Sequence, residues 1–369
     1  MAKSVVSIVR NKDASYAVKK SIELVGGLED KIEKNARVLL KPNLVYGVTY
    51  ETGTTTNPAV LRTLVELIRP ITKDIALIES NFGIVPIPES PMPIYKEVGK
   101  VFKLPEFEAM KKLGVRLVDL TKEKKRSFSL TPNKILDSVE IPVDLYDGAT
   151  LVNAAVLKSH GITTVTLGIK NLYGLIPTPP IRNRLHGTIS TVLSDLAELF
   201  SSIFTVIDGS VGMEGPSSCF GAPVGSDLMI ASDNVVAADS VGTRVMGYNP
   251  ENIGHIAEAA KRGLGNLDDI EVKGETIEKV KKKFNMDMQL PHNIVRKVKD
   301  LGTAKEEDLL PLYPSDNDLV RRYLKTFVMY GPLVRDGETY RFETKLFKNF
   351  ICRKCVQTGH SFCAGWKQI

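Results

Sequence analysis

Four reactive side chains interrupt an otherwise apolar stretch of the sequence, residues 157–174 (LKSHGITTVTLGIKNLYG). They are Lys158, His160, Lys170 and Asn171. The aliphatic and β-branched residues around them are typical of a buried segment. An ammonium group that is removed from water destabilises the fold unless it has a partner. We therefore expect these groups either to line a cleft that holds an anion or to pair with other side chains.

Polar residues also follow four of the strands that the apolar runs predict. They are Lys41 and Asn43 after 38–40, Glu79 to Asn81 after 75–78, Lys158 to His160 after 150–156, and Asp208 and then Glu214 after 204–207. In open α/β sheets, ligands bind beyond the carboxyl ends of the strands. The segment TGTTTN, residues 52–57, precedes a helix expected to begin at Pro58, so its hydroxyls, including that of Thr56, would face an anion. The recurrence predicts one site at this edge.

The elements that must position these groups alternate along the chain. Short apolar runs predict strands at 38–40, 75–78, 115–118, 150–156, 204–207 and 228–231. Helical patterns lie between them: one begins at Asn57–Pro58, one contains 192–200, and one runs from Asp233 or Asn234 toward Met246. This alternation predicts an α/β fold, with a parallel or mixed sheet covered by helices on both faces.

Two segments depart from that pattern. Residues 82–147 contain the proline-rich run GIVPIPESPMPIY and are expected to form an insertion in a core of residues 1–268. Residues 269–369 are expected to form a basic C-terminal extension with an amphipathic helix at 317–330, a hairpin around Asp336–Gly337 and a group of Cys and His residues.

Several motifs together resemble one known family. They are VLLKPNLV, TTTNPAVL, LKSH with GIKNLYG, RNRLHG, VIDGSVGMEGPSS, GAPV and ASDNVVAADSVGTRVMGY, in that order over roughly residues 35–265. The chain resembles the DUF362 family, a domain of unknown function whose members are often associated with ferredoxin-type iron–sulfur segments. The residues that match its recurring polar motifs are Lys41, Asn43, Lys158, His160, Lys170, Asn171, His186, Asp208, Glu214 and Asp239.

The resemblance implies that Lys158, His160 and Lys170 converge with Lys41 at one end of the sheet. The candidate catalytic residues are His160, His186, Lys158 and Asp208, and the candidate ligand-binding residues are Lys41, Asn43, Thr56, Lys170, Asn171 and Glu214. Such a cleft would bind a phosphate or carboxylate, with His160 or His186 transferring a proton. The competing interpretation is structural: Lys41 or Lys170 pairs with Asp208, His160 is a core histidine, and Asp239 bonds a neighbouring turn.

Other chemistry-bearing motifs are absent from the sequence. It contains no GxxxxGK[ST], no GxGxxG, no GxSxG and no HExxH. These absences argue against a P-loop ATPase, a simple Rossmann dehydrogenase, an α/β-hydrolase and a zincin. An acid–base enzyme acting on an anionic metabolite, an iron–sulfur-linked oxidoreductase and a metabolite-binding protein without chemistry stay open.

The C-terminal cysteines have the spacing of a metal site. Cys352, Cys355, His360 and Cys363 read C-x2-C-x4-H-x2-C. Three thiolates and one imidazole suit tetrahedral zinc, although the last spacing is shorter than in a zinc knuckle. An iron–sulfur cluster is the alternative cofactor and would need a further ligand, such as Cys219. The third interpretation is reduced thiols without metal.

The charge of the chain is concentrated near its end. The formal net charge is +6, and the residues from Leu319 onward include ten basic and three acidic side chains. This tail either is a solvated surface or contacts RNA or an acidic partner. No apolar run is long enough for a membrane span and the start of the chain lacks the pattern of a signal peptide, so we expect no membrane partner and a cytoplasmic location. The sequence leaves a homo-oligomer open.

Overall fold

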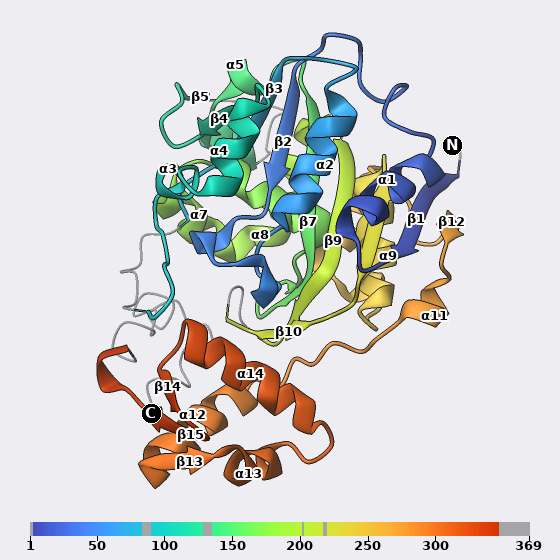
Figure 1. The fold of residues 1–369 in the computed structure, drawn as a ribbon. Coiled ribbons are helices and arrows are strands. Elements are labelled where there is room, and N and C mark those ends of the chain that lie inside the picture. Colours follow the sequence, from blue (N-terminus) through green and yellow to red (C-terminus); the bar gives the residue numbers. More distant parts are fainter. Residues whose placement is uncertain (1–2, 83–89, 128–134, 201–202, 217–219, 347–369) are drawn as a thin grey trace.

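The computed structural model of the chain describes residues 3–82, 90–127, 135–200, 203–216 and 220–346. Its centre is a ten-stranded sheet in which the strands lie in the order β12-β1-β11-β9-β7-β2-β3-β4, with β10 beside β9 and β8 beside β7 (Figure 1). In that order they are β12 (Ile270–Gly274), β1 (Ser4–Arg10), β11 (Leu228–Ser232), β9 (Ile203–Glu214), β7 (Thr150–His160), β2 (Val38–Pro42), β3 (Ile75–Glu79), β4 (Arg116–Asp119), β10 (Ala222–Val224) and β8 (Thr164–Val165).

The strands that carry the candidate residues are parallel. β9, β7, β2, β3 and β4 run in one direction, and β11 is antiparallel to both β9 and β1. Lys41 of β2 stands beside Asn153 of β7, which in turn stands beside Thr205 of β9. The carboxyl ends of the parallel strands therefore meet at one edge, and the predicted α/β class with a mixed sheet is confirmed.

Two strands are longer than the sequence predicts. β7 and β9 were expected to end at Val156 and Ile207, but they continue to His160 and Glu214. Their pairing shifts in register between Val156 and Lys158 and then resumes with Lys158 beside Met213. Such a bulge bends a strand without ending it. The polar residues that were taken to follow these strands thus lie within them.

Helices cover both faces of the sheet, each over its own apolar cluster (Figure 1). One face carries α1 (Ala14–Leu24), α2 (Pro58–Ile68), α3 (Val98–Val101) and α4 (Pro105–Lys112); the other carries α5 (Val143–Tyr146), α6 (Leu167–Asn171), α8 (Ile189–Leu199), α9 (Val235–Val245), α10 (Gly254–Lys261) and α11 (Ile277–Val280). The predicted start of α2 is confirmed: the Asn57 side chain accepts a hydrogen bond from the Ala59 N–H, and Pro58 occupies the first turn.

The segment 82–147 contains both a sheet strand and small local elements. β4 lies within it and pairs with β3, while β5 (Arg126–Ser127) and β6 (Glu140–Ile141) form a separate two-stranded sheet. None of the helices in the described ranges is long and apolar enough to cross a membrane.

The C-terminal part of the described chain has its own apolar cluster, which includes Leu319, Tyr323 and Phe327. Its elements are α12 (Leu290–Leu301), β13 (Thr303–Lys305), α13 (Glu306–Leu309), α14 (Asn317–Met329), β14 (Leu333–Asp336) and β15 (Thr339–Phe342). The predicted helix at 317–330 and the predicted hairpin are confirmed, with Gly337 at φ 58° in the turn. Figure 1 shows this region beyond the end of β9, where α14 packs on β10.

Candidate functional site

A buried ion pair lies where β2 and β3 end. Lys41 is 1% exposed, and its Nζ is 2.6 Å from Oε2 of Glu79 and 2.6 Å from the carbonyl oxygen of Pro42. Gly174 lies against this pair, since a Cβ there would stand 2.7 Å from Oε1 of Glu79. Burial lowers the pKa of Lys41, and Glu79 opposes that shift. The partner of Lys41 is thus Glu79 and not Asp208.

Two further cations lie near this ion pair. Arg182, on α7 (Pro179–Arg184), is 8% exposed and donates to the Ser80 hydroxyl and to the carbonyl oxygens of Asn81 and, at 3.1 Å, Ile176. All three acceptors are neutral. Sequence reasoning named its neighbour His186 and missed Arg182, because nothing local in RNRLHG distinguishes a buried arginine from an exposed one.

Lys170 on α6 is the second of these cations. Its Nζ lies 4.7 Å from the centre of the Tyr173 ring, and within the described chain it makes no ion pair with a carboxylate. Burial lowers its pKa to about 7, and the charges of Arg182 and Lys41 add to that shift. We call Lys41, Lys170, Arg182 and Glu79 the cation cluster. It holds three cationic side chains and one carboxylate.

The short helix that carries Lys170 is held by a buried carboxylate. Asp239 of α9 accepts hydrogen bonds from the Gly168 N–H at 2.6 Å and the Ile169 N–H at 2.8 Å. Burial raises the pKa of the Asp239 carboxyl, and the two N–H bonds oppose that rise. A Cβ on Gly168 would lie 2.7 Å from Oδ1 of Asp239, so a glycine allows this close contact. Asp239 therefore positions α6.

Asn171 is the second anchor of α6. Its Nδ2 donates to Oδ1 of Asn153 at 2.8 Å and lies 3.3 Å from the Lys41 carbonyl oxygen. Asn153 in turn donates to the Gly168 carbonyl oxygen at 2.9 Å. These bonds tie α6 to β7 and β2, and they use the Asn171 amide nitrogen for structure.

Lys158 contacts a different part of the molecule. It is 1% exposed, and its Nζ donates to the Thr54 carbonyl oxygen at 2.8 Å and to Oδ1 of Asn43 at 3.2 Å. Thr56 accepts from the Asn43 N–H at 2.9 Å and donates to the Ala154 carbonyl oxygen at 2.8 Å. Lys158, Asn43 and Thr56 thus fasten the loop 52–57 to the sheet.

Asp208 fastens the same loop. Its Oδ2 accepts from the Asn57 N–H at 2.8 Å, and its Oδ1 accepts from the N–H and hydroxyl of Ser210 at 2.9 and 2.7 Å. Burial raises the pKa of Asp208, and these bonds oppose that rise. We call Lys158, Asp208 and the loop 52–57 the loop clamp. Both of its charged side chains are bonded to the backbone of that loop.

Glu214, at the far end of β9, binds the C-terminal part of the chain. Its Oε1 pairs with the guanidinium of Arg322 on α14, and its Oε2 accepts from the Asn285 N–H at 2.7 Å. Both carboxylate oxygens are thereby used by the protein, and Glu214 is 2% exposed. The structure does not bring Glu214 into the cation cluster.

The two predicted histidines carry their ring protons on different nitrogens. Nδ1 of His160 accepts from the N–H groups of Ile162 and Thr163 at 3.1 and 3.3 Å, so the neutral ring bears its hydrogen on Nε2. Nδ1 of His186 lies 3.2 Å from the Asn183 carbonyl oxygen and must donate to it, which makes Nε2 the basic nitrogen. Burial, followed by the charge of Lys170, holds the pKa of His160 well below its usual range.

A third histidine was missed by sequence reasoning. His255 on α10 is 1% exposed, and its Nε2 has no hydrogen-bond partner within the described chain. Burial lowers its pKa to about 3, with a further contribution from the charge of Lys170. Both His160 and His255 are therefore neutral at pH 7, and the positive charge near them belongs to lysine and arginine.

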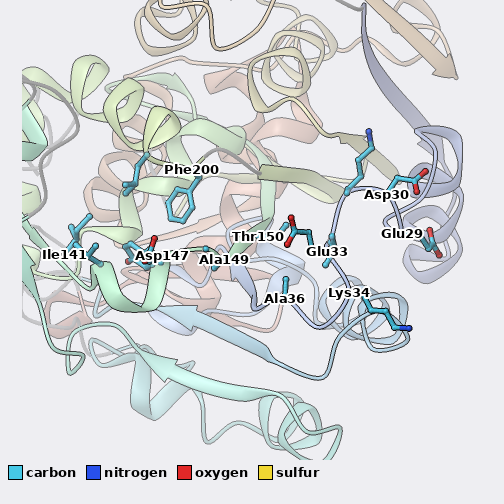
Figure 2. A pocket seen from close by; sticks show the side chains of 16 residues that line it. Glu29, Asp30, Glu33, Lys34, Ala36, Ile141, Asp147, Ala149, Thr150 and Phe200 are labelled. Atoms are coloured by element: carbon cyan, nitrogen blue, oxygen red, sulfur yellow. The ribbon is translucent and has the colours of Figure 1, made fainter.

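A cavity of about 770 Å³ lies elsewhere, where β2 and β7 begin (Figure 2). Figure 2 shows Thr150, the first residue of β7, and Phe200 on its wall, with Glu29, Glu33 and Asp147 around it. This is the edge of the sheet opposite to the cation cluster. Its lining includes more carboxylates than lysines, which does not suit an anion. The chemistry of the side chains, and not the size of this hollow, locates the candidate site.

A comparison with protein families places the chain among known sequences. The model of the family described as "Domain of unknown function (DUF362)" matches residues 38–244. The chain belongs to the DUF362 family. The matched segment contains Lys41, Glu79, Lys170 and Arg182, so the whole cation cluster lies in the DUF362 domain. His255 and the C-terminal elements lie beyond it.

One curated relative of this DUF362 protein is "Thylakoid-associated protein sll1697" of Synechocystis sp.. It is 25% identical over 255 residues, which cover 66% of this chain and 73% of the relative. No solved structure significantly matches the chain. The name of the relative associates it with thylakoids and states no reaction. The cytoplasmic location of the present chain stays a prediction.

The predicted metal site lies outside the described residues. Cys352, Cys355, His360 and Cys363 belong to 347–369, and Cys219 belongs to 217–219. In the ranges that the structure describes, no group of three or more His, Cys, Asp or Glu side chains is arranged to hold a metal ion. Zinc and the iron–sulfur alternative both remain predictions from the sequence.

Proposed function

We propose that this DUF362 protein binds an anionic small molecule, bearing phosphate or carboxylate, at the cation cluster. The observation that carries the proposal is the charge imbalance of Lys41, Lys170 and Arg182 around Glu79, the one carboxylate that the described residues place among them. Like charges that are buried together destabilise a fold, and an anion bound among them removes that cost. A guanidinium and ammonium groups are also the usual ligands of phosphate and carboxylate.

The loop clamp has a supporting role in this proposal. Its charged groups are already bonded to the backbone, so Lys158 and Asp208 are assigned to holding the loop 52–57 and not to catalysis. His186 is the better candidate for proton transfer, because its Nδ1–H bond to a carbonyl leaves Nε2 as the basic nitrogen. Acid–base chemistry on the bound anion is the reaction class that these groups support.

Anion binding is tested by thermal unfolding in the presence of phosphate, pyrophosphate or citrate, with chloride at matched ionic strength as the reference. An anion that binds only the folded state raises the melting temperature, and the rise grows with the logarithm of the anion concentration once that concentration exceeds the Kd. We expect Lys170→Met to weaken binding about tenfold or more, the value of one charge-assisted contact. Lys103→Met, at an exposed surface position, is the control. Equal shifts in all three proteins, or no shift beyond that of chloride, would refute the proposal.

The second candidate function, RNA binding by the basic tail, rests on the residues from Leu319 onward, of which 347–369 lie outside the described ranges. It stays a prediction that retention on an RNA column, measured against salt concentration, can test. The predicted iron–sulfur-linked oxidoreductase depends on the same tail. Neither is needed for the anion site, because the cation cluster is complete within the matched DUF362 segment.

A further inference from the structure

The three lysines near the carboxyl edge differ in how accessible they are. Lys41 and Lys158 are each 1% exposed, and their ammonium groups are bonded to oxygen atoms of the protein. Lys170 is only partly buried, and its ammonium group lies over the Tyr173 ring and makes no hydrogen bond or ion pair within the described residues. A molecule that approaches the Lys170 nitrogen would therefore not have to displace a hydrogen bond or ion pair that the fold uses.

The position of Lys170 is fixed even though its charge is not paired. Asp239 holds the first turn of α6 and Asn171 holds its end, so the helix that carries Lys170 is anchored on both sides. Reactions between a side chain and a bound molecule are fast when the two groups are held in place beforehand. The anchoring fixes the backbone from which the Lys170 side chain extends.

The charged surroundings of Lys170 favour its neutral form. Arg182 on α7 and Lys41 on β2 are cations, while the nearby carboxylate, Glu79 on β3, is paired with Lys41. The histidines whose pKa values respond to Lys170, His160 and His255, are neutral. With burial, these charges lower the pKa of Lys170 to about 7, so a large fraction of the amine is unprotonated at neutral pH. An unprotonated amine is a nucleophile toward carbonyl carbon.

We propose that Lys170 forms a Schiff base with the carbonyl group of an anionic aldehyde or 2-oxo acid. The inference rests on the proposed anion site, in which the charges of Arg182 and Lys41 attract the phosphate or carboxylate of that molecule. The amine nitrogen attacks the carbonyl carbon, and the carbonyl π electrons move to oxygen. The resulting carbinolamine loses water, which carries away the carbonyl oxygen and both amine hydrogens, and the C=N bond forms. The step needs no oxidant or reductant.

The same two cations serve both parts of this step. They attract the anionic group of the substrate, and they repel a proton from Lys170. A lysine activated by neighbouring cations is an established way to prepare an amine for Schiff-base chemistry. A substrate with a carbonyl and an anionic group on adjacent or nearby carbons would use the whole cluster.

The test is reductive trapping on the full-length protein. Pyridoxal 5′-phosphate, a phosphate-bearing aldehyde, is added with borohydride, and pyruvate with cyanoborohydride is the carboxylate-bearing arm. Peptide mapping by mass spectrometry locates the adduct. We expect the adduct on the peptide that carries Lys170, half-maximal labelling near the pKa of about 7, and protection by inorganic phosphate. The arm that labels more strongly identifies phosphate or carboxylate as the preferred group.

Labelling spread over surface lysines, or no protection by phosphate, would overturn the inference. Lys170→Arg separates it from the proposed function, since arginine keeps the charge but cannot form the adduct. If phosphate still stabilises wild type and Lys170→Arg but no adduct forms at Lys170 in wild type, the Schiff base is wrong and the anion site stands. If phosphate does not bind wild type either, both fail. Mapping on the wild-type protein decides the matter even if the variant does not fold.

Discussion

The cation cluster and the loop clamp lie at the same edge of one sheet, and both bury lysine and carboxylate side chains. In the loop clamp, Lys158 and Asp208 are bonded to backbone groups of the loop 52–57 and its flanks. In the cation cluster, Glu79 stands among three cationic side chains, and the Lys170 ammonium group lies over the Tyr173 ring without a hydrogen bond or ion pair in the described residues. In the loop clamp the two charges are met by protein groups, whereas in the cation cluster the cations outnumber the carboxylate. Under our proposal, an anion would stabilise only the second arrangement, so the balance of the buried charges separates the two regions.

Removing the carboxylate of the cation cluster is expected to have the largest effect. Glu79→Gln leaves Lys41 and Arg182 without their buried counter-charge and should destabilise the protein by about 3–5 kcal/mol. Phosphate should restore part of that loss. The measurement is urea unfolding with and without phosphate. The matched control is Glu66→Gln, which breaks an exposed helical ion pair with Arg62 and should lower the free energy of unfolding by less than about 0.5 kcal/mol. A loss as small as that of the control would show that the cluster is not strained.

Removing the Lys170 amine should change how the free energy of unfolding depends on pH. The unfolded chain keeps the Lys170 proton until about pH 10.4, whereas the folded protein releases it near a pKa of about 7. The unfolded state then binds more protons across this window, so wild-type stability rises with pH. The rise is at most about 1.4 kcal/mol per pH unit, and less because Lys170 is partly exposed to solvent.

Lys170→Met lacks that rise. Its free energy of unfolding should exceed that of wild type most at pH 6, and the difference should shrink by pH 9. Urea unfolding at both pH values measures it, with Lys103→Met for comparison. A difference that is constant with pH would mean that Lys170 stays charged in the fold.

Substitution in the loop clamp should lower the stability of the protein by an amount that does not depend on added anions. Asp208→Asn keeps the shape but removes the charge that accepts bonds from Asn57 and Ser210, and should cost about 1–3 kcal/mol. The loss should be the same with and without phosphate. Unfolding of this variant in both buffers checks the expectation. If phosphate restored the stability of Asp208→Asn as much as that of Glu79→Gln, the loop clamp and the cation cluster would have to be parts of one anion site.

Substitutions in the cysteine tail are expected to have the smallest effect on the cation cluster and the loop clamp. Metal content of protein purified without oxygen, before and after Cys352→Ser with Cys355→Ser, measures whether zinc or an iron–sulfur cluster is held there. We expect one zinc per chain that the double variant loses, with phosphate binding unchanged. Weaker phosphate binding in that variant would connect the tail to the cation cluster.

The sequence predicted the fold through signals that are local. The Asn57–Pro58 helix start, the parallel strands and the Asp336–Gly337 turn were all recognisable because capping, apolar runs and turn residues act within a few positions. Strand β1, which lies between β12 and β11 near one edge of the sheet, was missed, because a short apolar run does not by itself distinguish a strand from a buried helical segment. β12, partly exposed at the edge of the sheet, was also missed.

The site could be predicted only in part, because pairing across strands is not local. Lys41 and Lys170 were recognised as candidates, but the sequence offered Asp208 as the carboxylate and the fold supplies Glu79. Arg182 and His255 gave no signal, because burial of a polar side chain depends on the packing of distant segments. Because β9 continues to Glu214, this carboxylate lies away from the cation cluster and pairs with Arg322 instead.

The ion pair between Glu214 and Arg322 has a consequence for how the chain can be dissected. Cutting the protein after the DUF362 domain would leave the buried Glu214 carboxylate without its guanidinium and would uncover the face of β10 on which α14 packs. Removing one partner of a buried pair costs more than the pair contributes. We therefore expect the sheet and the C-terminal elements to unfold together, and an excised DUF362 fragment to be less stable than the same segment in the intact protein.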